Sequence, residues 1–479
     1  MLANSLYWYD FETTGISPAT DRVIQFAGVR TDLDFNIIAE PDVFYCQLAN
    51  DVLPHPEAAL VTGISPQLTL QKGLIERDFT ARIHQQFSQP QTCVVGYNSI
   101  RFDDEFTRQL LYRNFYDPYA REWKSGNSRW DLIDVVRLTH ALRPDGINWP
   151  SRDDGNVSFK LEALCQSNNI VHESAHDALS DVYATIGLAK LIKDKQPKLY
   201  AWAFELKNKK TAAQQLKLDD GSAVVHISGM YPSSKDCLAV VMPLIKHPVN
   251  QNGVVVYDLS YDSQDLINLP VEELQKRLYA RTDELKDGEH RLGIKTVHLN
   301  KSPMLAPIGT LTADVIKKLQ IDLEECEKNR QAILDANITD KLEALFSTNN
   351  FEKDDDPDLM LYSGGFFSAQ DARNMTHIRS SSLDELANLD LPFEDERLEE
   401  MLLRYKARNY PQMLNEQQRK VWQQYRYNKL TQTPLKGGLT FELYFEKLDE
   451  LISQEGWSDK EQQLLEDLIE YGETLEEGF

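Results

Sequence analysis

The stretch LYWYDFETTG, residues 6–15, decides the architecture of the N-terminal region. A run of apolar and aromatic residues typical of a buried strand carries two carboxylates, Asp10 and Glu12, and Gly15 then allows the chain to turn. Side chains two residues apart on a strand point to the same face, so these two acids project together. Neighbouring carboxylates repel each other unless a cation lies between them. Because Asp-x-Glu pairs also occur by chance at solvated strand ends, their interpretation depends on acids further along the chain.

The composition is that of a soluble globular protein. Hydrophobic residues make up 42% and charged residues 26% of the 479 positions, and this length suggests about three domains. No apolar run approaches the roughly 18 residues that span a bilayer, and the N-terminus lacks the pattern of a secretory signal. Five scattered cysteines without a C-x-x-C pair favour reduced thiols over disulfides or structural zinc. We therefore expect a cytoplasmic protein that does not contact a membrane.

The formal net charge of −24 is unevenly distributed along the chain. Residues 440–479 contain thirteen acids and two bases, a net charge of −11. Because this tail carries nearly half of the excess, the overall sign does not exclude a nucleic-acid partner elsewhere on the surface.

The first 200 residues predict an α/β domain with a mixed sheet. After the first strand, residues 23–30 and 36–48 alternate as two further strands of an antiparallel meander, and residues 92–97 form a short apolar strand. Residues 60–66 are rich in turn formers. Helical spacing marks residues 73–87, 104–115, 130–141, 159–166 and 177–193.

The rest of the chain predicts two further domains. Residues 201–350 are expected to form a small β-barrel-like domain with appended helices, its strands at 224–228, 238–244, 254–259 and 295–299 and its helices at 271–279 and 313–346. The acidic segment 349–358 is expected to be a linker, since it has no core to bury. Residues 360–479 are expected to be helical, with periodic segments at 369–375, 394–408, 415–428 and 439–471.

Further acids in the N-terminal domain complete a possible metal site. Asp103 opens a helix that follows a strand, and Asp181 lies in the first turns of the last helix, so both can point toward Asp10 and Glu12. Four converging acids without matching bases require divalent cations, and ligation by carboxylates alone favours Mg²⁺ or Mn²⁺ over zinc. Paired ions of this kind serve phosphodiester hydrolysis. His176, five residues before Asp181, lies off the metal-facing side of the helix and suits a general base for the attacking water.

These residues match, in chain order, the three motifs of the DEDDh exonucleases, which the chain resembles. Asp10 and Glu12 fall on the first motif, Asp103 on the second, and His176 and Asp181 on the third. The resemblance implies a ribonuclease H-like fold and the removal of nucleotides from 3′ ends with two metal ions.

Three segments narrow the resemblance to the exonuclease I family of bacteria: RNFYDPY (113–119), NSRWDL (127–132) and LRPDGINWP (142–150). Beyond residue 200 the similarity is looser and rests on the layout and on short stretches such as SGGFFS (363–368). It implies an SH3-like middle domain and processive degradation of single-stranded DNA to mononucleotides in repair and recombination. It also implies contact with the acidic C-terminal tail of single-strand DNA-binding protein.

Two segments rich in bases and aromatic residues are candidates for the DNA path. Single strands are bound by cations at the phosphates and by flat rings at the bases, and residues 108–130 and 404–429 supply both. The competing interpretation is that the rings pack into cores and the bases lie on solvated helix faces. The predicted DNA contacts are Arg108, Arg113, Tyr119, Arg121, Trp123, Lys124, Arg129, Arg404, Arg408, Trp422 and Arg426.

The sequence therefore predicts a monomeric 3′ to 5′ exodeoxyribonuclease that uses two Mg²⁺ ions, for which Mn²⁺ can substitute. Asp10 should contact both ions, with Glu12 and Asp181 completing the first site and Asp103 supporting the second. Two alternatives stay open. One is a 3′ to 5′ exoribonuclease of the same superfamily, because no pattern reads the 2′-hydroxyl, and the other is a single-strand-binding protein without catalytic activity.

Overall fold

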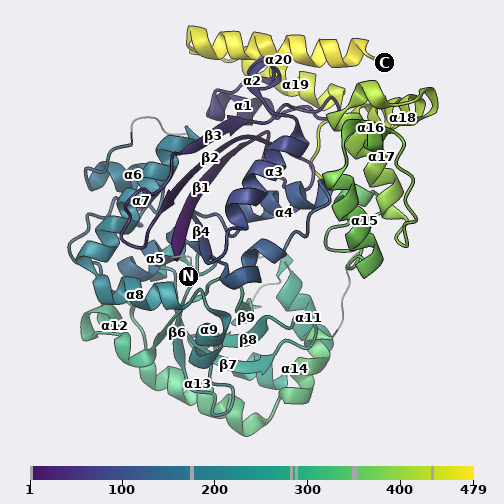
Figure 1. Cartoon of the computed structure of the whole chain (residues 1–479). Coiled ribbons are helices and arrows are strands. Elements are labelled where there is room, and N and C mark those ends of the chain that lie inside the picture. Colours follow the sequence, from purple (N-terminus) through teal and green to yellow (C-terminus); the bar gives the residue numbers. More distant parts are fainter. Residues whose placement is uncertain (1–3, 173–176, 281–283, 286–289, 348–353, 433–435) are drawn as a thin grey trace. The chain divides into compact units, whose positions relative to one another are not determined.

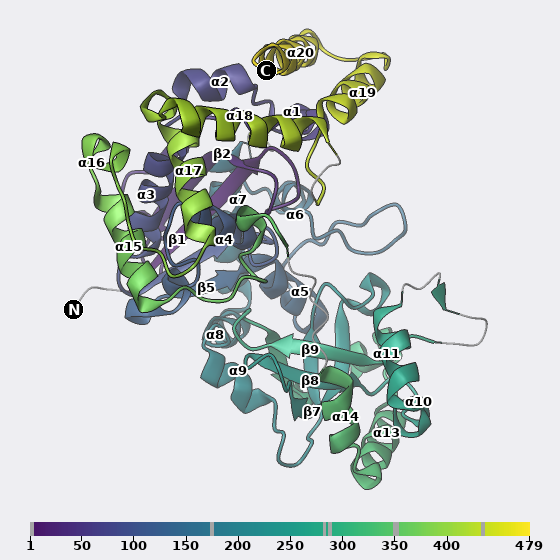
Figure 2. The ribbon, with the colours of Figure 1, turned by 90° about the vertical axis from the view of Figure 1, so that its right-hand side faces the viewer.

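The computed structural model describes residues 4–172, 177–280, 284–285, 290–347, 354–432 and 436–479. The chain forms two compact units. The first contains Met1–Ser128, His172–Tyr183 and Phe351–Phe479, and the second contains Arg129–Val171 and Ala184–Asn350. Figures 1 and 2 show the ribbon from two sides.

A mixed sheet forms the centre of the first unit. Its strands β1 (Ser5–Thr13), β2 (Val23–Thr31), β3 (Asp42–Tyr45) and β4 (Thr92–Gly96) lie in the order β3-β2-β1-β4. β1 pairs antiparallel with β2 and parallel with β4, so the predicted mixed sheet is confirmed. β5 (Ser128–Asp131) follows where the chain leaves this unit.

The strand predicted at residues 36–48 is wrong in its first half. Only β3 forms there, preceded by a turn in which the carboxylate of Asp32 accepts hydrogen bonds from the backbone N–H groups of Asp34 and Asn36. Pro41 also lacks the N–H that a ladder needs. The side-chain turn and the proline outweigh the alternating pattern of the segment.

The helices α1 (Pro56–Thr62) and α2 (Pro66–Lys72) replace most of the turn predicted at residues 60–66. Each begins with a proline at its first position, where the missing N–H costs nothing. The turn is confined to the link between them, where Gly63 has φ +67° and the Ser65 side chain accepts from the N–H of Leu68. The helices α3 (Glu76–Phe87) and α4 (Asp103–Arg113) lie close to their predicted positions.

The C-terminal part of the first unit is helical, as predicted. The single helix expected at residues 439–471 is two helices, separated by a turn at Gly456, where φ is +104°. The elements are α15 (Ala369–Ser380), α16 (Leu383–Ala387), α17 (Arg397–Asn409), α18 (Glu416–Thr431), α19 (Phe441–Ile452) and α20 (Asp459–Glu477).

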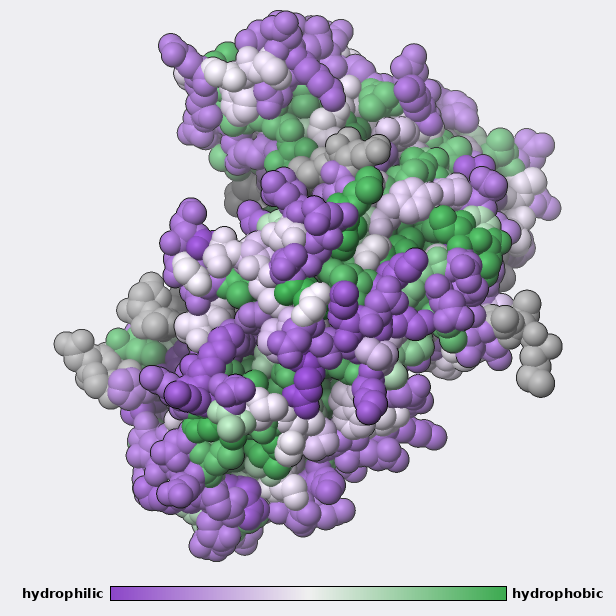
Figure 3. Space-filling view, turned by 90° about the vertical axis from the view of Figure 1, so that its left-hand side faces the viewer, coloured by the Kyte–Doolittle hydropathy of each residue, from purple (hydrophilic) through white to green (hydrophobic). Residues whose placement is uncertain are grey.

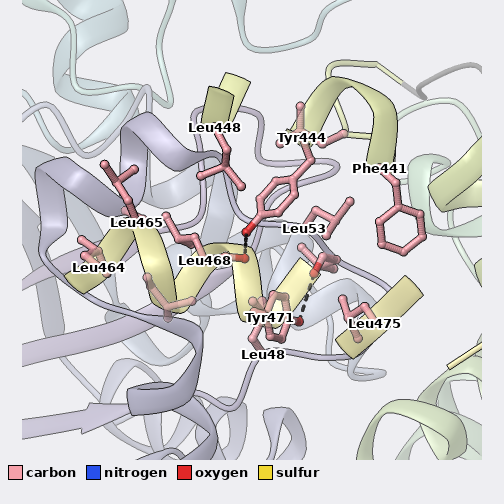
Figure 4. Close-up of a cluster of buried hydrophobic side chains, with 14 of the residues drawn as sticks. Leu48, Leu53, Phe441, Tyr444, Leu448, Leu464, Leu465, Leu468, Tyr471 and Leu475 are labelled. Carbon is pink, nitrogen blue, oxygen red and sulfur yellow. Dashed lines mark hydrogen bonds between the residues drawn. The ribbon is translucent and has the colours of Figure 1, made fainter. Parts of the chain in front are cut away.

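A shared core joins these helices to the N-terminal part of the same unit (Figure 4). Leu48 and Leu53 from the segment after β3 pack with Leu468 and other leucines of α19 and α20. Tyr444 donates its hydroxyl to the carbonyl of Leu468 at 2.7 Å, and Tyr471 donates to the carbonyl of Val52 at 3.1 Å. Burial of this apolar surface explains why segments from the two ends of the sequence form one compact unit.

The second unit is built around an antiparallel sheet with the order β10-β6-β7-β8-β9. Four of its strands lie at the predicted segments, and β10 was not predicted. The strands are β6 (Val224–Ile227), β7 (Leu238–Lys246), β8 (Gly253–Asp258), β9 (Ile294–His298) and β10 (Met304–Pro307). Its helices are α5 (Leu132–Leu142), α6 (Leu161–Ser167), most of α7 (Ala178–Lys195), α8 (Pro197–Glu205), α9 (Lys209–Gln215), α10 (Gln264–Asn268), α11 (Val271–Tyr279), α12 (Ala313–Leu319), α13 (Leu323–Ala336) and α14 (Thr339–Phe346).

Two expectations about the chemistry of the chain can be compared with the structure. All five cysteines are buried and free, which agrees with reduced thiols. Among the described residues, no helix has the length and apolar character needed to cross a membrane. On the face shown in Figure 3, apolar patches alternate with hydrophilic side chains.

Candidate active site

Asp10 and Glu12 lie on an interior strand of the first sheet. β1 is hydrogen-bonded to β2 on one side and to β4 on the other, and Asp10 faces Ala27 across the β1–β2 pair while Glu12 faces Gln25. The single residue between the two acids places both side chains on one face. Glu12 is 7% exposed and Asp10 is half-buried. The pairing with β4 covers Ser5–Trp8, so the ladder with β2 is what holds the two carboxylates in place.

Asp181 joins this pair from the first turn of α7. The helix begins beside Asp177, whose carboxylate accepts a hydrogen bond from the backbone N–H of Ser180 at 3.0 Å. One carboxylate oxygen from each of Asp10, Glu12 and Asp181 lies within 4.8 Å of the others. Three of the four predicted ligands therefore come together from distant parts of the sequence.

Asp103 is the first residue of α4 and is 4% exposed. It lies close enough to Asp10 for its charge to raise the pKa of that carboxyl. The neighbouring Asp104 has a different role, because it accepts a hydrogen bond from the Tyr9 hydroxyl at 2.8 Å and pairs with Arg121 at 2.5 Å. Of two adjacent buried acids, one is thus neutralised by an arginine and the other adds to the acidic cluster.

The cluster raises the pKa values of its own carboxyl groups. Burial is the main cause for Glu12, and the charges of Asp10, Asp181 and Asp177 add to it, so its pKa rises from 4.5 to about 9. The pKa of Asp10 lies well above its usual range because of burial and then the charges of Asp103 and Asp181. A divalent cation would reverse this unfavourable field. The donor atoms are all carboxylate oxygens in close proximity, and this donor set fits a hard cation.

The predicted general base, His176, lies outside the described residues. A second histidine, His172, contacts the cluster directly, with its Nε2 2.5 Å from Oδ1 of Asp181. No motif in the sequence pointed to this contact. The available signal was the spacing of two histidines four residues apart just before α7.

Four arginines of the first predicted DNA segment are engaged within the protein. Each is at most 5% exposed. A buried guanidinium that is bonded to protein groups would have to give up those bonds to bind a phosphate, and breaking a buried ion pair costs about 3–5 kcal/mol. The structure therefore places these four side chains in contact with protein groups, and their contact with DNA stays a prediction. The pairs are Arg108 with Glu122, Arg113 with Glu76, Arg121 with Asp104, and Arg129 with the carbonyl of Asn300.

The predicted contacts of the second segment also have buried side chains: Arg404, Trp422 and Arg426 are at most 4% exposed, and the side chain of Arg408 is 3% exposed. Trp422 packs against Leu414 and Ala407, which agrees with the alternative that the aromatic rings of this segment lie in a core. Here too the protein itself supplies partners for the cations, and the contact of these residues with DNA stays a prediction. They are Asp356 and Asp358 for Arg404, Asp51 and Asp358 for Arg408, and the carbonyl of Asn50 for Arg426.

Other predicted contacts are accessible. Trp123 is 67% exposed, Lys124 is exposed, and Tyr119 is half-buried. The structure adds Phe366, which is 91% exposed and meets the ring of Tyr119 edge to face with the centroids 6.2 Å apart. Ile16, 85% exposed, directly follows the turn after the acidic strand. Phe366 lies in the SGGFFS stretch, so the sequence contains this ring, but its exposure is visible only in the structure.

Three family models match consecutive parts of the chain. The exonuclease model covers residues 7–189, the exonuclease I SH3-like domain covers 207–348, and the exonuclease I C-terminal domain covers 355–475. With the mixed sheet of the first unit and the C-terminal helices, these matches confirm the predicted fold class: an α/β ribonuclease H-like exonuclease domain, an SH3-like β domain and a helical C-terminal domain.

Proteins of known activity resemble the chain over its whole length. It is 45% identical to exodeoxyribonuclease I of Haemophilus influenzae over 98% of both chains. An exonuclease I structure from Methylocaldum szegediense shares 46% identity with a TM-score of 0.94 and covers 99% of this chain and 100% of that one. Exonuclease I of Escherichia coli in complex with a dA16 oligonucleotide shares 41% identity with a TM-score of 0.94, over 98% of this chain and 100% of that one.

A further structure of the E. coli protein contains a bound zinc ion with single-stranded DNA. Another similar structure is that of single-strand DNA-binding protein and exonuclease I in complex with an inhibitor. The full-length similarity, the matching domain order and the acidic cluster on β1 agree with one another. The chain belongs to the exodeoxyribonuclease I family.

Proposed function

We propose that the chain removes mononucleotides from the 3′ end of single-stranded DNA by hydrolysis that depends on two Mg²⁺ ions, for which Mn²⁺ can substitute. The observation that carries the proposal is the convergence of Asp10, Glu12 and Asp181 within 4.8 Å, with Asp103 beside Asp10. The full-length similarity to exodeoxyribonucleases supports DNA over RNA as the substrate.

The four acids have separate tasks in this proposal. Asp10 would contact both ions, Glu12 and Asp181 would complete one site, and Asp103 would support the other. The ions supply activation of the attacking water and stabilisation of the leaving oxygen. His176 would accept the proton of that water, as the third DEDDh motif implies. The raised pKa of Glu12 supports the metal assignment, because a bound cation is what would keep this buried carboxyl ionised at neutral pH.

Exposed rings and cations outline a path for the strand. Bases would stack on Trp123, Phe366 and Tyr119, while Lys124 would bind a phosphate. Ile16 would contact the nucleotide at the reacting end, since it follows the acidic strand and is 85% exposed. The buried arginines would act indirectly by holding the loops that carry these side chains.

The cellular setting is also a proposal. We place the protein in the cytoplasm as a monomer of three domains, residues 1–200, 201–350 and 360–479, that acts processively in DNA repair and recombination. The acidic C-terminal tail of single-strand DNA-binding protein is its proposed partner, and the similar structure named for single-strand DNA-binding protein and exonuclease I supports this pairing.

Digestion of end-labelled oligonucleotides tests the reaction. A 5′-labelled single strand should shorten from its 3′ end in Mg²⁺ or Mn²⁺ and stay intact in EDTA, and a 3′ label should appear at once as a mononucleotide. Matched RNA should be cut far more slowly. Release of 5′ label first, or equal rates on RNA, would contradict the proposal.

Asp10→Asn is the central variant, with Asp145→Asn as its matched control. Asp145 is an exposed acid in the second unit, so its replacement should leave turnover unchanged. Asp10→Asn should abolish hydrolysis and leave strand binding largely intact. Retained turnover in Asp10→Asn would exclude the metal site as drawn.

A further inference from the structure

His172 makes a contact that neither the proposed reaction nor the DEDDh motifs use. It lies in the extended segment after α6, and its Nε2 is 2.5 Å from Oδ1 of Asp181. The His172 side chain is 7% exposed, and that of Asp181 is 19% exposed. The contact joins residues nine positions apart in the sequence.

We propose that His172 is a positioning residue that holds the carboxylate of Asp181 in the orientation needed for metal binding. This inference rests on the proposed metal site. A carboxylate has two oxygens with several lone pairs, so Asp181 can accept a hydrogen bond from the imidazole and still offer an oxygen toward Asp10 and Glu12. Metal-binding carboxylates in proteins are commonly fixed by hydrogen bonds of this kind.

The surroundings of Asp181 explain why such a donor is needed. The carboxylate faces Asp10 and Glu12, whose own pKa values its charge helps to raise. Asp177 adds a further negative charge nearby. Without a donor, like-charge repulsion would favour rotamers that turn Asp181 away from the pair. The hydrogen bond from His172 opposes that rotation.

The role requires only an N–H group at Nε2. That group is present in one neutral tautomer and in the imidazolium ion alike, so the argument does not depend on the ionisation of the ring. It also separates His172 from a general base, because the nitrogen that faces the cluster is already bonded to a carboxylate. His176 keeps the proposed task of taking the proton from water.

Two substitutions separate the hydrogen bond from the bulk of the ring. His172→Gln keeps an N–H donor at nearly the position of Nε2, whereas His172→Phe keeps a flat ring without a donor. His84→Phe is the matched control, since His84 is another partly buried histidine of the first unit, bonded to Ser88 through its ring.

Binding of Mn²⁺ to DNA-free protein, followed by calorimetry, provides the readout. His172→Phe should weaken Mn²⁺ binding by about 10- to 100-fold, the range found when a partner of a metal ligand is lost. His172→Gln should stay within a few-fold of the wild type, and His84→Phe should bind as the wild type does. Raising Mn²⁺ should restore much of the kcat of His172→Phe, whereas it should not restore His176→Ala.

Equal Mn²⁺ affinity in the wild type and His172→Phe would overturn the inference, and so would equal losses in the Gln and Phe variants. If the phenylalanine variant does not fold, His172→Ala takes its place, because it removes the donor without adding bulk. Asp10→Asn and Glu12→Gln are measured in parallel. If these variants also bind Mn²⁺ normally, the proposed metal site fails; if they lose binding and His172→Phe does not, only the role of His172 fails.

Discussion

Replacing Asp51 by asparagine should destabilise the first unit without touching the candidate active site. Asp51 is fully buried in the segment after β3 and joins it to the C-terminal helices. Its carboxylate lies 2.8 Å from the guanidinium of Arg408 on α17 and 2.8 Å from the ammonium of Lys429 on α18. Arg408 and Lys429, in that order, lower the pKa of Asp51 well below its usual value, against the opposing effect of burial.

The magnitude follows from what the substitution leaves behind. Asparagine retains one acceptor oxygen but no charge, so Lys429 loses the buried carboxylate it contacts and Arg408 keeps its contact with Asp358. Removing one partner of a buried ion pair costs about 3–5 kcal/mol. Across a cooperative unit of this size, that corresponds to a fall of roughly 6–10 °C in Tm.

The assay is thermal unfolding of the full chain followed by circular dichroism. Glu57→Gln is the control, because Glu57 also pairs with a C-terminal lysine, Lys447, but at the surface. Exposed pairs contribute about 0–1 kcal/mol, so the control should lower Tm by no more than about 2 °C. Equal, small shifts in both variants would refute the argument that Asp51 holds the C-terminal helices in place.

The pH dependence provides a second check on Asp51. Because the folded-state pKa is lowered, the stabilisation is fully present above the unfolded pKa of about 3.9 and is lost as the pH falls toward the folded value. The Tm difference between wild type and Asp51→Asn should therefore be constant from about pH 5 to 7 and shrink below about pH 4. A difference that stays unchanged from pH 5 down to pH 2 would show that the loss is not electrostatic.

Three other predictions follow from the site. Asp103→Asn should abolish nuclease activity with little loss of Tm. Asp104→Asn should lower the free energy of unfolding by about 3–5 kcal/mol, because Arg121 loses its buried partner. Activity assays and unfolding curves compare the two variants. Phe366→Ala should weaken single-strand binding by roughly 5- to 100-fold, as loss of one stacking ring does, in a fluorescence anisotropy titration in EDTA. His176→Ala should lower kcat by about 10²- to 10⁴-fold at saturating Mg²⁺, and a change below threefold would exclude it as the base.

The sequence alone determined the acidic cluster and the class of fold. The period of two along a strand places Asp10 and Glu12 on one face, and this holds wherever the strand lies. Asp103 and Asp181 begin helices, and the placement of an acid in a first helical turn is also a local property. Local rules therefore located four acids that a resemblance could then assemble into one site.

Local pattern was less reliable where side chains compete with the backbone or where a turn is short. The segment before β3 alternates like a strand, yet Asp32 folds it into a turn. Gly63 separates two helices in a segment that the pattern predicted to be a turn. Gly456 separates two helices where the pattern predicted a single long one. In each case a few residues of special geometry outweighed the average of the segment.

Only the tertiary structure decided the fate of the basic and aromatic segments. Arg408 has the sequence context of a DNA-binding residue, but its partner Asp51 lies 357 positions away and is invisible to any local pattern. The contact between His172 and Asp181 likewise depends on the path of the chain into α7. The sequence shows how many positively charged residues a segment contains. Whether a cation faces solvent or a buried acid depends on packing between distant elements, because desolvation and pairing are fixed only once those elements meet.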